Sequence, residues 1–495
     1  MISKSLLITI SILLILVSFP GGEFPLLVCI AVAPALIATA SLNPIQSALA
    51  LGVWAWIWWL AALGWAIPSL AIFSESSAFI SILSITLACF TLAIPYALSG
   101  FLIAYFRLWK SSLSLLQIPL CFAILISLFS TVLPAAPVNA LFEYPILLQW
   151  ADIGGLPILL FFYFIFNTSI ASIFIHKKDR AYITIVMLIF IPMMVLSYGQ
   201  YKLSEEAKTN TTKITFGYIQ PLAHSEDKLS HLISQTHKLK QVSEQLELVI
   251  WPEVPVDFSW YDNQYERYRI RKLAQEIDAH LIILSGFHYA NNINAEGGHY
   301  NSATFISNNG SRLAEYRKQK LVPIFEYLPF KNYLSPFFPS ARNYIAGIEP
   351  ILFNYKDRSL APLICYEVLF SDLVKPYVDD GADIIINPGN DGWFGRVGAL
   401  SHLSLALLRT IEYRIPLIRV NNSGVSTVIN HKGEILFDTL SMLDTQMEKS
   451  FSLEIAKGEH TFFYQYGSIL NLLGILLFCL SLLFKRDKVT LRTDH

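Results

Sequence analysis

The chain has 495 residues, of which 54% are hydrophobic and 15% carry a charge. Lys and Arg together number 36 against 37 Asp and Glu, so the net charge is −1. This balance gives no reason to expect nucleic-acid binding, and the apolar excess is high for a protein that is soluble throughout. The length leaves room for two or three domains.

Long apolar segments dominate the first two hundred residues. The first follows Lys4 and begins like a signal sequence, but no small-residue cleavage site comes after it, so we predict a retained span. Each segment is long enough, or nearly so, to cross about 30 Å of hydrocarbon. The predicted spans, seven before a polar region and one after it, lie near residues 5–18, 24–42, 46–68, 82–106, 116–136, 157–175, 181–199 and 465–484.

Charges in the connecting loops predict the orientation of the spans. The loops at 67–81 and 137–156 contain Glu75, Glu143 and Asp152 and no Lys or Arg. The basic residues that follow the fourth, sixth and eighth spans are Arg107, Lys110, Lys177, Lys178, Arg180, Lys485, Arg486, Lys488 and Arg492. Because basic loops stay in the cytoplasm, the polar region is predicted to be periplasmic. We therefore expect a multi-pass protein of the bacterial inner (cytoplasmic) membrane.

The polar region alternates strand-like and helix-like patterns. Residues 264–279 have apolar residues at helical spacing, with Arg and Glu on the other face. Short β-rich runs occur at 213–219, 247–251, 282–285, 384–387, 417–420 and 426–429. We predict three parts: a transmembrane helical bundle (1–199), an α/β catalytic domain (200–462), and a last transmembrane helix with a basic cytoplasmic tail (463–495).

Cys365 stands apart from the other cysteines. It follows the apolar run 360–364 and precedes Tyr366 and Glu367, which is typical of a residue at the end of a buried strand. The chain has no CxxC pair, which argues against a thiolate zinc site. Taken alone, Cys365 is better interpreted as a buried, inert cysteine. The remaining four lie in predicted spans, where a free thiol is a small hydrophobe: Cys29, Cys89, Cys121 and Cys479.

Glu253 and Lys318 form a coherent chemical set with Cys365. A thiol becomes a nucleophile when a base or a positive charge is near it. Glu253 can take the proton of the thiol, and Lys318 can stabilise the thiolate and then the oxyanion of a tetrahedral intermediate. Each also has a structural alternative, because Glu253 could cap a helix and Lys318 could be a solvated charge.

The spacing and flanks of these residues match a known family. The chain resembles the nitrilase, or carbon–nitrogen hydrolase, superfamily, whose members use a Glu-Lys-Cys triad in this chain order. With apolar spans on both sides of the domain, it is similar to the apolipoprotein N-acyltransferase family. The matching motifs are Trp251-Pro252-Glu253; Lys318 with Leu321-Val322-Pro323 and Glu326; Cys365-Tyr366-Glu367; Asn390-Asp391-Gly392-Trp393-Phe394-Gly395; and Gly424-Val425-Ser426 after Asn422.

The resemblance implies a role for each matched residue. Glu253 falls on the general base, Lys318 on the oxyanion-stabilising lysine and Cys365 on the nucleophile. Glu326 falls on a second glutamate that supports the lysine and the base. Tyr366 and Glu367 fall on a pair that helps activity. The resemblance also implies a nitrilase-like αββα sandwich inserted between the spans, with no cofactor and no metal.

Some positions depart from the family pattern. Phe325 replaces a glycine, so the loop there is expected to run differently. Leu229 stands where the family often has a tryptophan. Pro221 and Leu222 follow Gln220, and Pro388-Gly389 precedes Asn390, where other residues are usual. The chemical residues are kept, while the substrate-binding surroundings have drifted.

The expected reaction is a two-step acyl transfer. Cys365 would take an acyl chain from a membrane phospholipid, and the α-amine of a diacylglyceryl-cysteine on an apolipoprotein would then receive it. The protein is expected to act as a monomer. Two alternatives stay open: a membrane-tethered amidase that finishes with water, and a weakly active paralogue that binds lipoproteins, for which Leu229 and Phe325 are the motive. A transporter is disfavoured because the spans hold almost no charge.

The aromatic stretch 325–338 has two interpretations. It holds four phenylalanines and two tyrosines, and Pro329 and Pro336 limit regular structure. Its aromatic side chains could fill the domain core. Alternatively, the stretch could be a lid that meets the bilayer surface and guides acyl chains to Cys365.

Overall fold

The computed structural model describes residues 3–129, 133–176, 181–206, 210–221, 227–253, 260, 263–289, 299–340, 343–392, 394–437, 445–458 and 460–483. Several residues named above lie outside this set: Lys177, Lys178, Arg180, Leu222, Trp393, Lys485, Arg486, Lys488 and Arg492. The chain forms two compact units. One contains Met1–Ile67, Ile82–Glu205 and His460–His495, and the other contains Pro68–Ser81 and Glu206–Glu459. The division at residues 199 and 462 stays a prediction.

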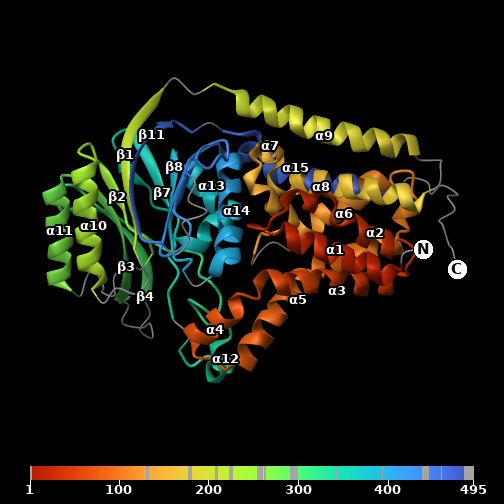
Figure 1. Cartoon of the computed structure of the whole chain (residues 1–495), viewed down its shortest axis with the longest axis horizontal. Coiled ribbons are helices and arrows are strands. Elements are labelled where there is room, and N and C mark those ends of the chain that lie inside the picture. The colour runs from red at the N-terminus through yellow and green to blue at the C-terminus, as the bar shows by residue number, and fades with distance from the viewer. Residues whose placement is uncertain are drawn as a thin grey trace. The chain divides into compact units, whose positions relative to one another are not determined.

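The first unit is built from apolar helices (Figure 1). Among the described residues, five helices are long and apolar enough to cross a membrane: α3 (Pro44–Leu63), α5 (Ala78–Tyr105), α8 (Ala151–Ile175), α9 (Ala181–Ser204) and α15 (Phe462–Ser481). Three shorter apolar segments are α1 (Lys4–Ser18), η1 with α2 (Pro25–Ile30 and Ala33–Thr39) and α6 (Ser114–Leu128). Short elements between them are α4 (Ala66–Ser74), η2 (Leu108–Lys110), η3 (Pro137–Glu143) and α7 (Pro145–Leu148). The eight helical segments match the predicted ones in position, while the count of seven spans before the domain and one after it stays a prediction.

Local sequence explains where these helices begin and bend. Asn43 caps α3, and its side chain accepts from the backbone N–H of Gln46 in a capping box. Gly155 interrupts α8 with a φ of +60°, and a Cβ there would lie 2.5 Å from the ring of Phe463. A glycine is therefore needed at this close approach between α8 and α15.

The second unit contains two mixed sheets. Six strands pair in the order β11-β1-β2-β3-β4-β5, and five pair in the order β10-β9-β8-β7-β6. Strands β1, β2 and β3 are parallel, and so are β7, β8 and β9. The strands are β1 (Thr211–Gln220), β2 (Leu248–Ile250), β3 (His280–Tyr289), β4 (His299–Ile306), β5 (Arg312–Arg317), β6 (Phe353–Tyr355), β7 (Arg358–Pro362), β8 (Ile384–Gly389), β9 (Leu417–Asn421), β10 (Thr427–Ile429) and β11 (Met447–Ala456).

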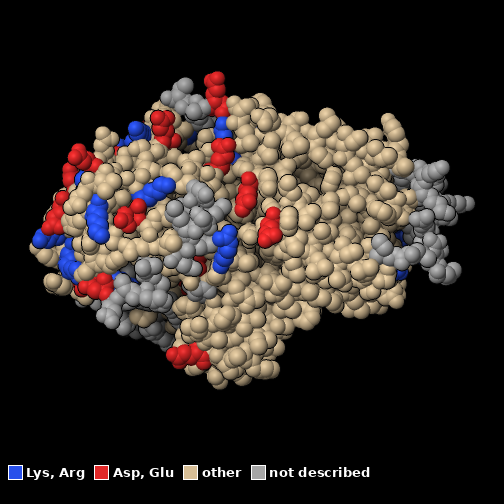
Figure 2. All heavy atoms as spheres, viewed as in Figure 1, with Lys and Arg blue, Asp and Glu red and all other residues tan. Residues whose placement is uncertain are grey.

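Helices cover the outer faces of both sheets. Figure 1 shows α10 (Lys228–Val242) and α11 (Gln264–Ile277) outside the six-stranded sheet. It shows α13 (Ser371–Asp379) and α14 (Gly395–Tyr413) outside the five-stranded sheet. This helix–sheet–sheet–helix order is the layer order of the expected αββα sandwich. On the face in Figure 2, charged side chains gather over this unit, whereas the apolar helices show almost none.

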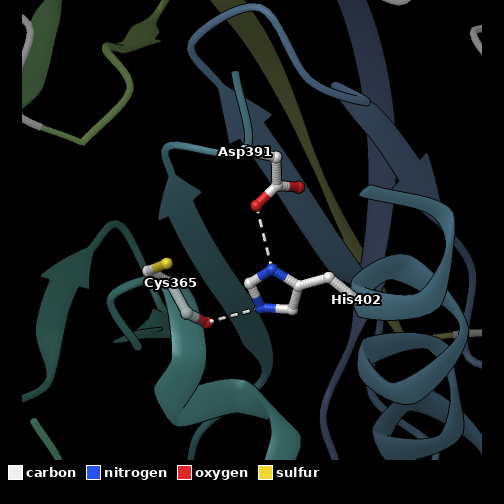
Figure 3. A group of neighbouring side chains, drawn as sticks. All are labelled: Cys365, Asp391 and His402. Carbon is white, nitrogen blue, oxygen red and sulfur yellow. Dashed lines mark hydrogen bonds and ion pairs between the residues drawn. The ribbon is translucent and has the colours of Figure 1, made fainter. Parts of the chain in front are cut away.

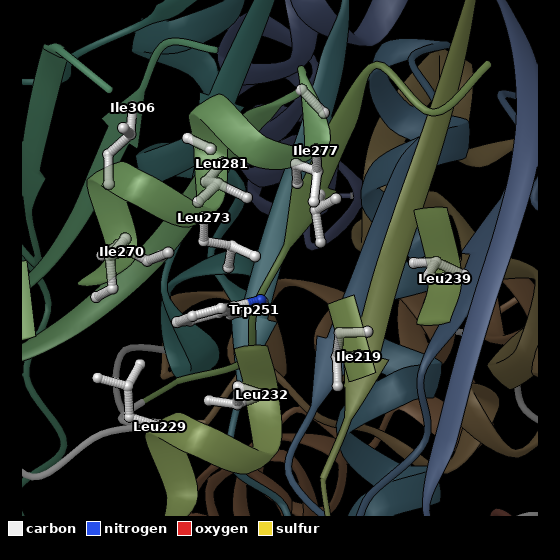
Figure 4. Close-up of a cluster of buried hydrophobic side chains, with 14 of the residues drawn as sticks. Ile219, Leu229, Leu232, Leu239, Trp251, Ile270, Leu273, Ile277, Leu281 and Ile306 are labelled. Atoms are coloured by element: carbon white, nitrogen blue, oxygen red, sulfur yellow. The ribbon is translucent and has the colours of Figure 1, made fainter. Parts of the chain in front are cut away.

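A hydrophobic cluster fills the space between the six-stranded sheet and its helices (Figure 4). The apolar face of α11 contributes residues at helical spacing, namely Ile270, Leu273, Ala274 and Ile277. Trp251, fully buried at the end of β2, lies in the same cluster and donates its indole N–H to Thr236 Oγ1 (3.2 Å). The core therefore anchors the strand end from which the chain continues to Glu253.

Candidate active site

Glu253 lies just beyond the carboxyl end of β2. Its backbone N–H donates to the carbonyl of Gly389 (3.2 Å), at the end of β8 in the other sheet. Its own carbonyl accepts from Nδ2 of Asn422 (2.5 Å). Contacts with the five-stranded sheet therefore fix the backbone of Glu253, and its side chain is buried.

Lys318 follows β5 directly and is held among buried polar groups. Its backbone N–H donates to the carbonyl of Asn301 (2.8 Å). Its ammonium Nζ lies 2.8 Å from Glu326 Oε1 and 3.4 Å from Glu253 Oε1. Because Lys318 is 1% exposed, and a buried charge needs paired partners, the two carboxylates hold the ammonium in place.

Asn301, on β4, joins the two carboxylates. Its Nδ2 donates to Glu253 Oε1 (2.7 Å) and to Glu326 Oε1 (3.3 Å). The other oxygen of Glu326 accepts from the backbone N–H of Val322 (2.8 Å). The two carboxylates are thus oriented by fixed donors as well as by Lys318.

Cys365 begins the 3₁₀ helix η6 (Cys365–Leu369), just after β7. Its φ is +53°, in the left-handed region that residues with a Cβ rarely adopt. The side-chain amide of Asn387 donates to its carbonyl (3.1 Å), and Nε2 of His402 lies 3.3 Å from the same oxygen. Figure 3 shows the thiol turned to the side away from the His402 ring in this view.

The buried charges act on the Cys365 thiol in opposite directions. Burial, and next the Glu253 carboxylate, raise the pKa of Cys365 well above its usual value, while the Lys318 ammonium opposes them. For Lys318, burial opposes the charged form, but the carboxylates of Glu253 and Glu326 outweigh it and raise the pKa well above its usual value. The site therefore holds a permanently charged ammonium and a thiol that needs a base to ionise.

Glu367 ties the nucleophile turn to the Lys318 turn. Its Oε2 accepts from the N–H of Ile364 (2.7 Å), next to Cys365. Its Oε1 accepts from the N–H groups of Gln319 (2.6 Å) and Lys320 (3.0 Å) and from the hydroxyl of Tyr316 (2.7 Å). Burial raises the pKa of Glu367 to about 7, against the effects of Lys318 and these hydrogen bonds. Glu367 thus joins the turn at Cys365 to the turn at Lys318.

Tyr366 is half-buried beside the same turn. Its ring meets that of Phe370 edge-on, with 4.8 Å between the ring centroids. Burial raises the pKa of its phenol. Tyr366 therefore borders the nucleophile as a neutral, partly exposed phenol.

A buried polar cluster lies behind the nucleophile. Among the described residues, Cys365, Asp391 and His402 have ligand-type atoms within 4.8 Å of one another. The carboxylate oxygens of Asp391 are already engaged, one by His402 Nδ1 (2.9 Å) and the other by Arg419 Nη2 (2.5 Å). The guanidinium supplies the positive charge that a metal ion would bring. The cluster is therefore a hydrogen-bond network, and the expected absence of a metal or cofactor stays a prediction.

Several of these site residues were missed by the sequence motifs. Asn301, Asn387 and Arg419 each lie in a strand, and each is fully buried. A polar residue in a buried strand needs a hydrogen-bond partner, and that signal was available in the sequence. Their partners, however, lie far away in the chain and were not predictable from spacing.

The family departures have local consequences. Leu229 belongs to the hydrophobic cluster of Figure 4, together with Trp251. The left-handed backbone near Phe325 falls on Ile324 (φ +70°), and Phe325 itself is not among the described residues with positive φ. A Cβ at Gly389 would lie 2.4 Å from Asn421 Oδ1. Leu229 therefore replaces a core residue, and Gly389 is required by close approach.

Comparison with known proteins gives two kinds of match. A family model described as carbon-nitrogen hydrolase matches residues 221–444. The apolipoprotein N-acyltransferase of Rhizobium leguminosarum bv. trifolii (strain WSM2304) is 28% identical over 466 residues, covering 85% of this chain and 82% of that protein. The apolipoprotein N-acyltransferase of Rickettsia prowazekii (strain Madrid E) is 27% identical over 440 residues, covering 81% and 86%.

A solved structure is also similar. The crystal structure of a carbon-nitrogen hydrolase from Helicobacter pylori G27 is 17% identical, covers 54% of this chain and 94% of that chain, and superposes with a TM-score of 0.39. Together, the buried Glu253, Lys318 and Cys365, the two mixed sheets and the matches over most of the sequence lead to one conclusion. The chain is similar to the apolipoprotein N-acyltransferases over most of its length, and its residues 221–444 match the carbon-nitrogen hydrolase model.

Proposed function

We propose that this membrane protein N-acylates lipoproteins, taking the acyl chain from a phospholipid through a thioester on Cys365. One observation carries the choice of acyl transfer over simple hydrolysis. The hydrolase model covers residues 221–444, whereas the similarity to acyltransferases covers 85% of the chain and so includes apolar helices. A chain that keeps its reactive domain attached to a membrane suits two substrates that are both anchored in lipid.

The first half-reaction would use the buried charges around the thiol. Glu253 takes the proton of Cys365, and the thiolate attacks the ester carbonyl carbon of the phospholipid. The ammonium of Lys318, held by Glu326, stabilises the oxyanion of the tetrahedral intermediate. The intermediate collapses, the C–O bond breaks, and Glu253 returns its proton to the departing lysophospholipid. A thioester on Cys365 remains.

The second half-reaction would run the same groups again. The α-amine of a diacylglyceryl-cysteine attacks the thioester carbonyl, and Glu253 takes a proton from the amine. The C–S bond breaks, an amide forms, and the thiolate recovers the proton from Glu253. Asn301 donates to both Glu253 and Glu326, so it would keep the base and the lysine aligned through both steps.

The departures at Leu229 and Phe325 were the motive for the alternative of a weakly active paralogue. Leu229 fills the core on the outer side of the six-stranded sheet, and Phe325 has no left-handed backbone. Neither position gives a reason to expect a disabled site.

Complementation tests the proposed function. The chain should restore growth to a strain depleted of its own N-acyltransferase, and mass spectrometry should find a third acyl chain on a lipoprotein N-terminus. Cys365→Ala should abolish both, and Cys365→Ser should be nearly as inactive, because a serine hydroxyl is far harder to ionise. The competing amidase activity has its own readout: a purified thioester that is discharged by water, and not by a diacylglyceryl-cysteine peptide, would overturn the proposal.

A further inference from the structure

The strained backbone of Cys365 is held by two side chains from different elements. Asn387, on β8, donates its amide to the carbonyls of Leu363 (2.6 Å) and Cys365 (3.1 Å), on either side of the turn. His402, on α14, places Nε2 3.3 Å from the Cys365 carbonyl. Because residues with a Cβ rarely adopt a φ of +53°, the surroundings must maintain this conformation.

One buried arginine connects these two side chains. Arg419, on β9, is fully buried. Its Nη1 donates to Asn387 Oδ1, which forms the first arm. Its Nη2 donates to Asp391 Oδ2 (2.5 Å), and Asp391 Oδ1 faces His402 Nδ1 (2.9 Å), which forms the second arm. Figure 3 shows dashed lines from Asp391 to the His402 ring and from the ring to the Cys365 carbonyl. Both arms end on the same carbonyl oxygen.

We propose that Arg419 is a positioning residue for Cys365. Arg419 sets the backbone of the nucleophile through the Asn387 arm and the Asp391–His402 arm. The inference rests on the proposed function only in taking Cys365 as the nucleophile. Arg419 is assigned no contact with substrate and acts through its two arms. Misplacing a nucleophile by about 1 Å can cost a hundredfold in rate, so the expected effect falls on the chemical step.

An arginine suits this position better than a lysine. The planar guanidinium presents donors in a fixed fork, so its two Nη atoms can serve Asn387 and Asp391 at once. An ammonium is a compact point charge with rotatable donors, so it lacks the fixed fork that spans Asn387 and Asp391. Burial and Arg419 lower the pKa of His402, and Asp391 opposes them. A neutral ring has one N–H and so donates either to the Asp391 carboxylate or to the Cys365 carbonyl, whereas the Asn387 arm donates to that carbonyl in either tautomer. Asp391 fixes the orientation of the ring.

A matched control is available in the same domain. Arg358 is also fully buried and begins β7, the strand that leads to Cys365. Its Nε donates to the carbonyl of Ile455 (2.9 Å) and its Nη2 to that of Asn210 (3.2 Å), at the other end of the strand. Arg358→Lys therefore reports the cost of changing a buried arginine without touching the Cys365 turn.

The experiment compares Arg419→Lys with Arg358→Lys in the full-length protein in detergent. Acylation of Cys365 is followed with phosphatidylethanolamine in mixed micelles and with p-nitrophenyl butyrate, a small activated ester. Arg419→Lys should lower the saturating acylation rate with both donors, by about tenfold to a hundredfold. The donor concentration for half-maximal rate should change by less than about twofold. Arg358→Lys should leave both quantities near the parent values, even if its Tm falls.

Asn387→Ser keeps the test decisive if Arg419→Lys does not fold. It removes the amide that holds both carbonyls and leaves the Arg419–Asp391 pair. Asn387→Ser should lower the saturating acylation rate by a similar factor. If both single variants fold, the double variant Arg419→Lys with Asn387→Ser should lose less rate than the product of the two single losses, because Arg419 acts partly through Asn387.

The outcomes distinguish the positioning role of Arg419 from the proposed function. A folded Arg419→Lys that acylates at the parent rate, or an equal loss in Arg358→Lys, overturns the positioning role. A parent protein that reacts with p-nitrophenyl butyrate and not with phospholipid overturns the proposed function, while the positioning role is still tested. A parent protein that reacts with neither donor overturns both.

Discussion

At the residue scale, two groups of opposite charge act on the Cys365 thiol. The Lys318 ammonium lowers its pKa and the Glu253 carboxylate raises it. Lys318 is held between Glu253 and Glu326, so its ammonium is fixed where the proposed mechanism needs it for the oxyanion. Glu253 also contacts Asn301, and its charge acts against ionisation of Cys365. Under the proposed mechanism, Cys365 is a thiol at neutral pH and becomes a thiolate when Glu253 accepts its proton. A lone cysteine with an adjacent lysine would instead ionise early and react with any electrophile.

This charge arrangement predicts opposite pH shifts for two variants. Glu253→Gln removes a charge that raises the pKa of Cys365, so the pH midpoint of its alkylation should move down. Lys318→Met removes the charge that lowers this pKa, so the midpoint should move up. The measurement is the iodoacetamide rate at the Cys365 peptide, read by mass spectrometry between pH 6 and about pH 11.

The same two variants separate electrostatics from base catalysis. Although Glu253→Gln makes the thiol easier to ionise, it should slow thioester formation at neutral pH by about a hundredfold or more, because the general base is lost. Midpoints that move in the same direction in both variants would contradict the charge assignment. Thioester formation at the parent rate in Glu253→Gln would show that another group is the base.

At the element scale, periodicity predicted the strands and helices well where one face is buried. The run 213–219 lies within β1 (Thr211–Gln220), 384–387 begins β8, and 264–279 contains α11 (Gln264–Ile277). The order in which the strands pair was harder to predict from the sequence. Strand β11 (Met447–Ala456) pairs antiparallel with β1, more than two hundred residues away, and has a weak burial alternation. Nothing local in its sequence specifies that partner.

The same limit applies to the candidate site. Glu253 and Cys365 could be singled out because each follows an apolar run that ends abruptly, and Lys318 because it completes a coherent chemical set with them. Arg419 and Asn301 act through partners on other strands, which only the sheet order brings together. Residue type and spacing therefore predicted the candidate reactive groups, while the buried groups around them could be identified only from the fold.

The aromatic stretch 325–338 contains a buried aromatic residue, as the core interpretation requires, and exposed ones, as the lid hypothesis requires. Phe338 is 4% exposed and belongs to the domain core. In contrast, Phe330 and Tyr333, at the start of α12 (Lys331–Leu334), are each 79% exposed. Exposed aromatics this large usually have a partner. The lid hypothesis therefore applies to α12 and its flank, and the core interpretation applies to Phe338.

These exposures define a sharper test of the lid. Phe330→Ser with Tyr333→Ser should keep the parent Tm, because neither ring is buried. It should lower thioester formation from phospholipid vesicles about fivefold or more, if the rings contribute to binding the lipid surface. Acylation by p-nitrophenyl butyrate should be unchanged. Phe338→Ser is the control and should lower stability by about 3–5 kcal/mol, as for other buried phenylalanines. Full phospholipid activity in the double variant would rule the lid out.

At the scale of the whole molecule, the quantity to determine is how many times the chain crosses the membrane. Helix α1 has 15 residues and so spans about 22 Å at 1.5 Å per residue, less than the roughly 30 Å of a hydrocarbon core. Helix α6 has the same length. The segment 24–42 is split into η1 and α2. Length alone therefore leaves the predicted count of eight undecided.

Contacts within the second unit constrain this count. Pro68–Ser81 folds with Glu206–Glu459, and the backbone N–H of Ser340 donates to the carbonyl of Ser74 (3.3 Å). Two segments that touch outside the membrane must lie on the same side of it. An even number of crossings must therefore separate them. Apart from the short elements η2, η3 and α7, the described helices between them are α5, α6, α8 and α9, so this contact supports a crossing by α6 despite its length.

Reporter fusions test this topology. Fusions after Ser204 and after Ser76 should both report the periplasm, and a fusion after Lys488 should report the cytoplasm, because basic residues collect at the cytoplasmic ends. A reporter at the N-terminus decides the crossing by α1. Seven crossings before the domain put the N-terminus in the cytoplasm, as Lys4 favours, whereas six would put it in the periplasm. Opposite compartments for the Ser76 and Ser204 fusions would refute the even count. A periplasmic Lys488 fusion would remove α15 from the spans, and the charge bias that orients the whole chain would then have to be abandoned.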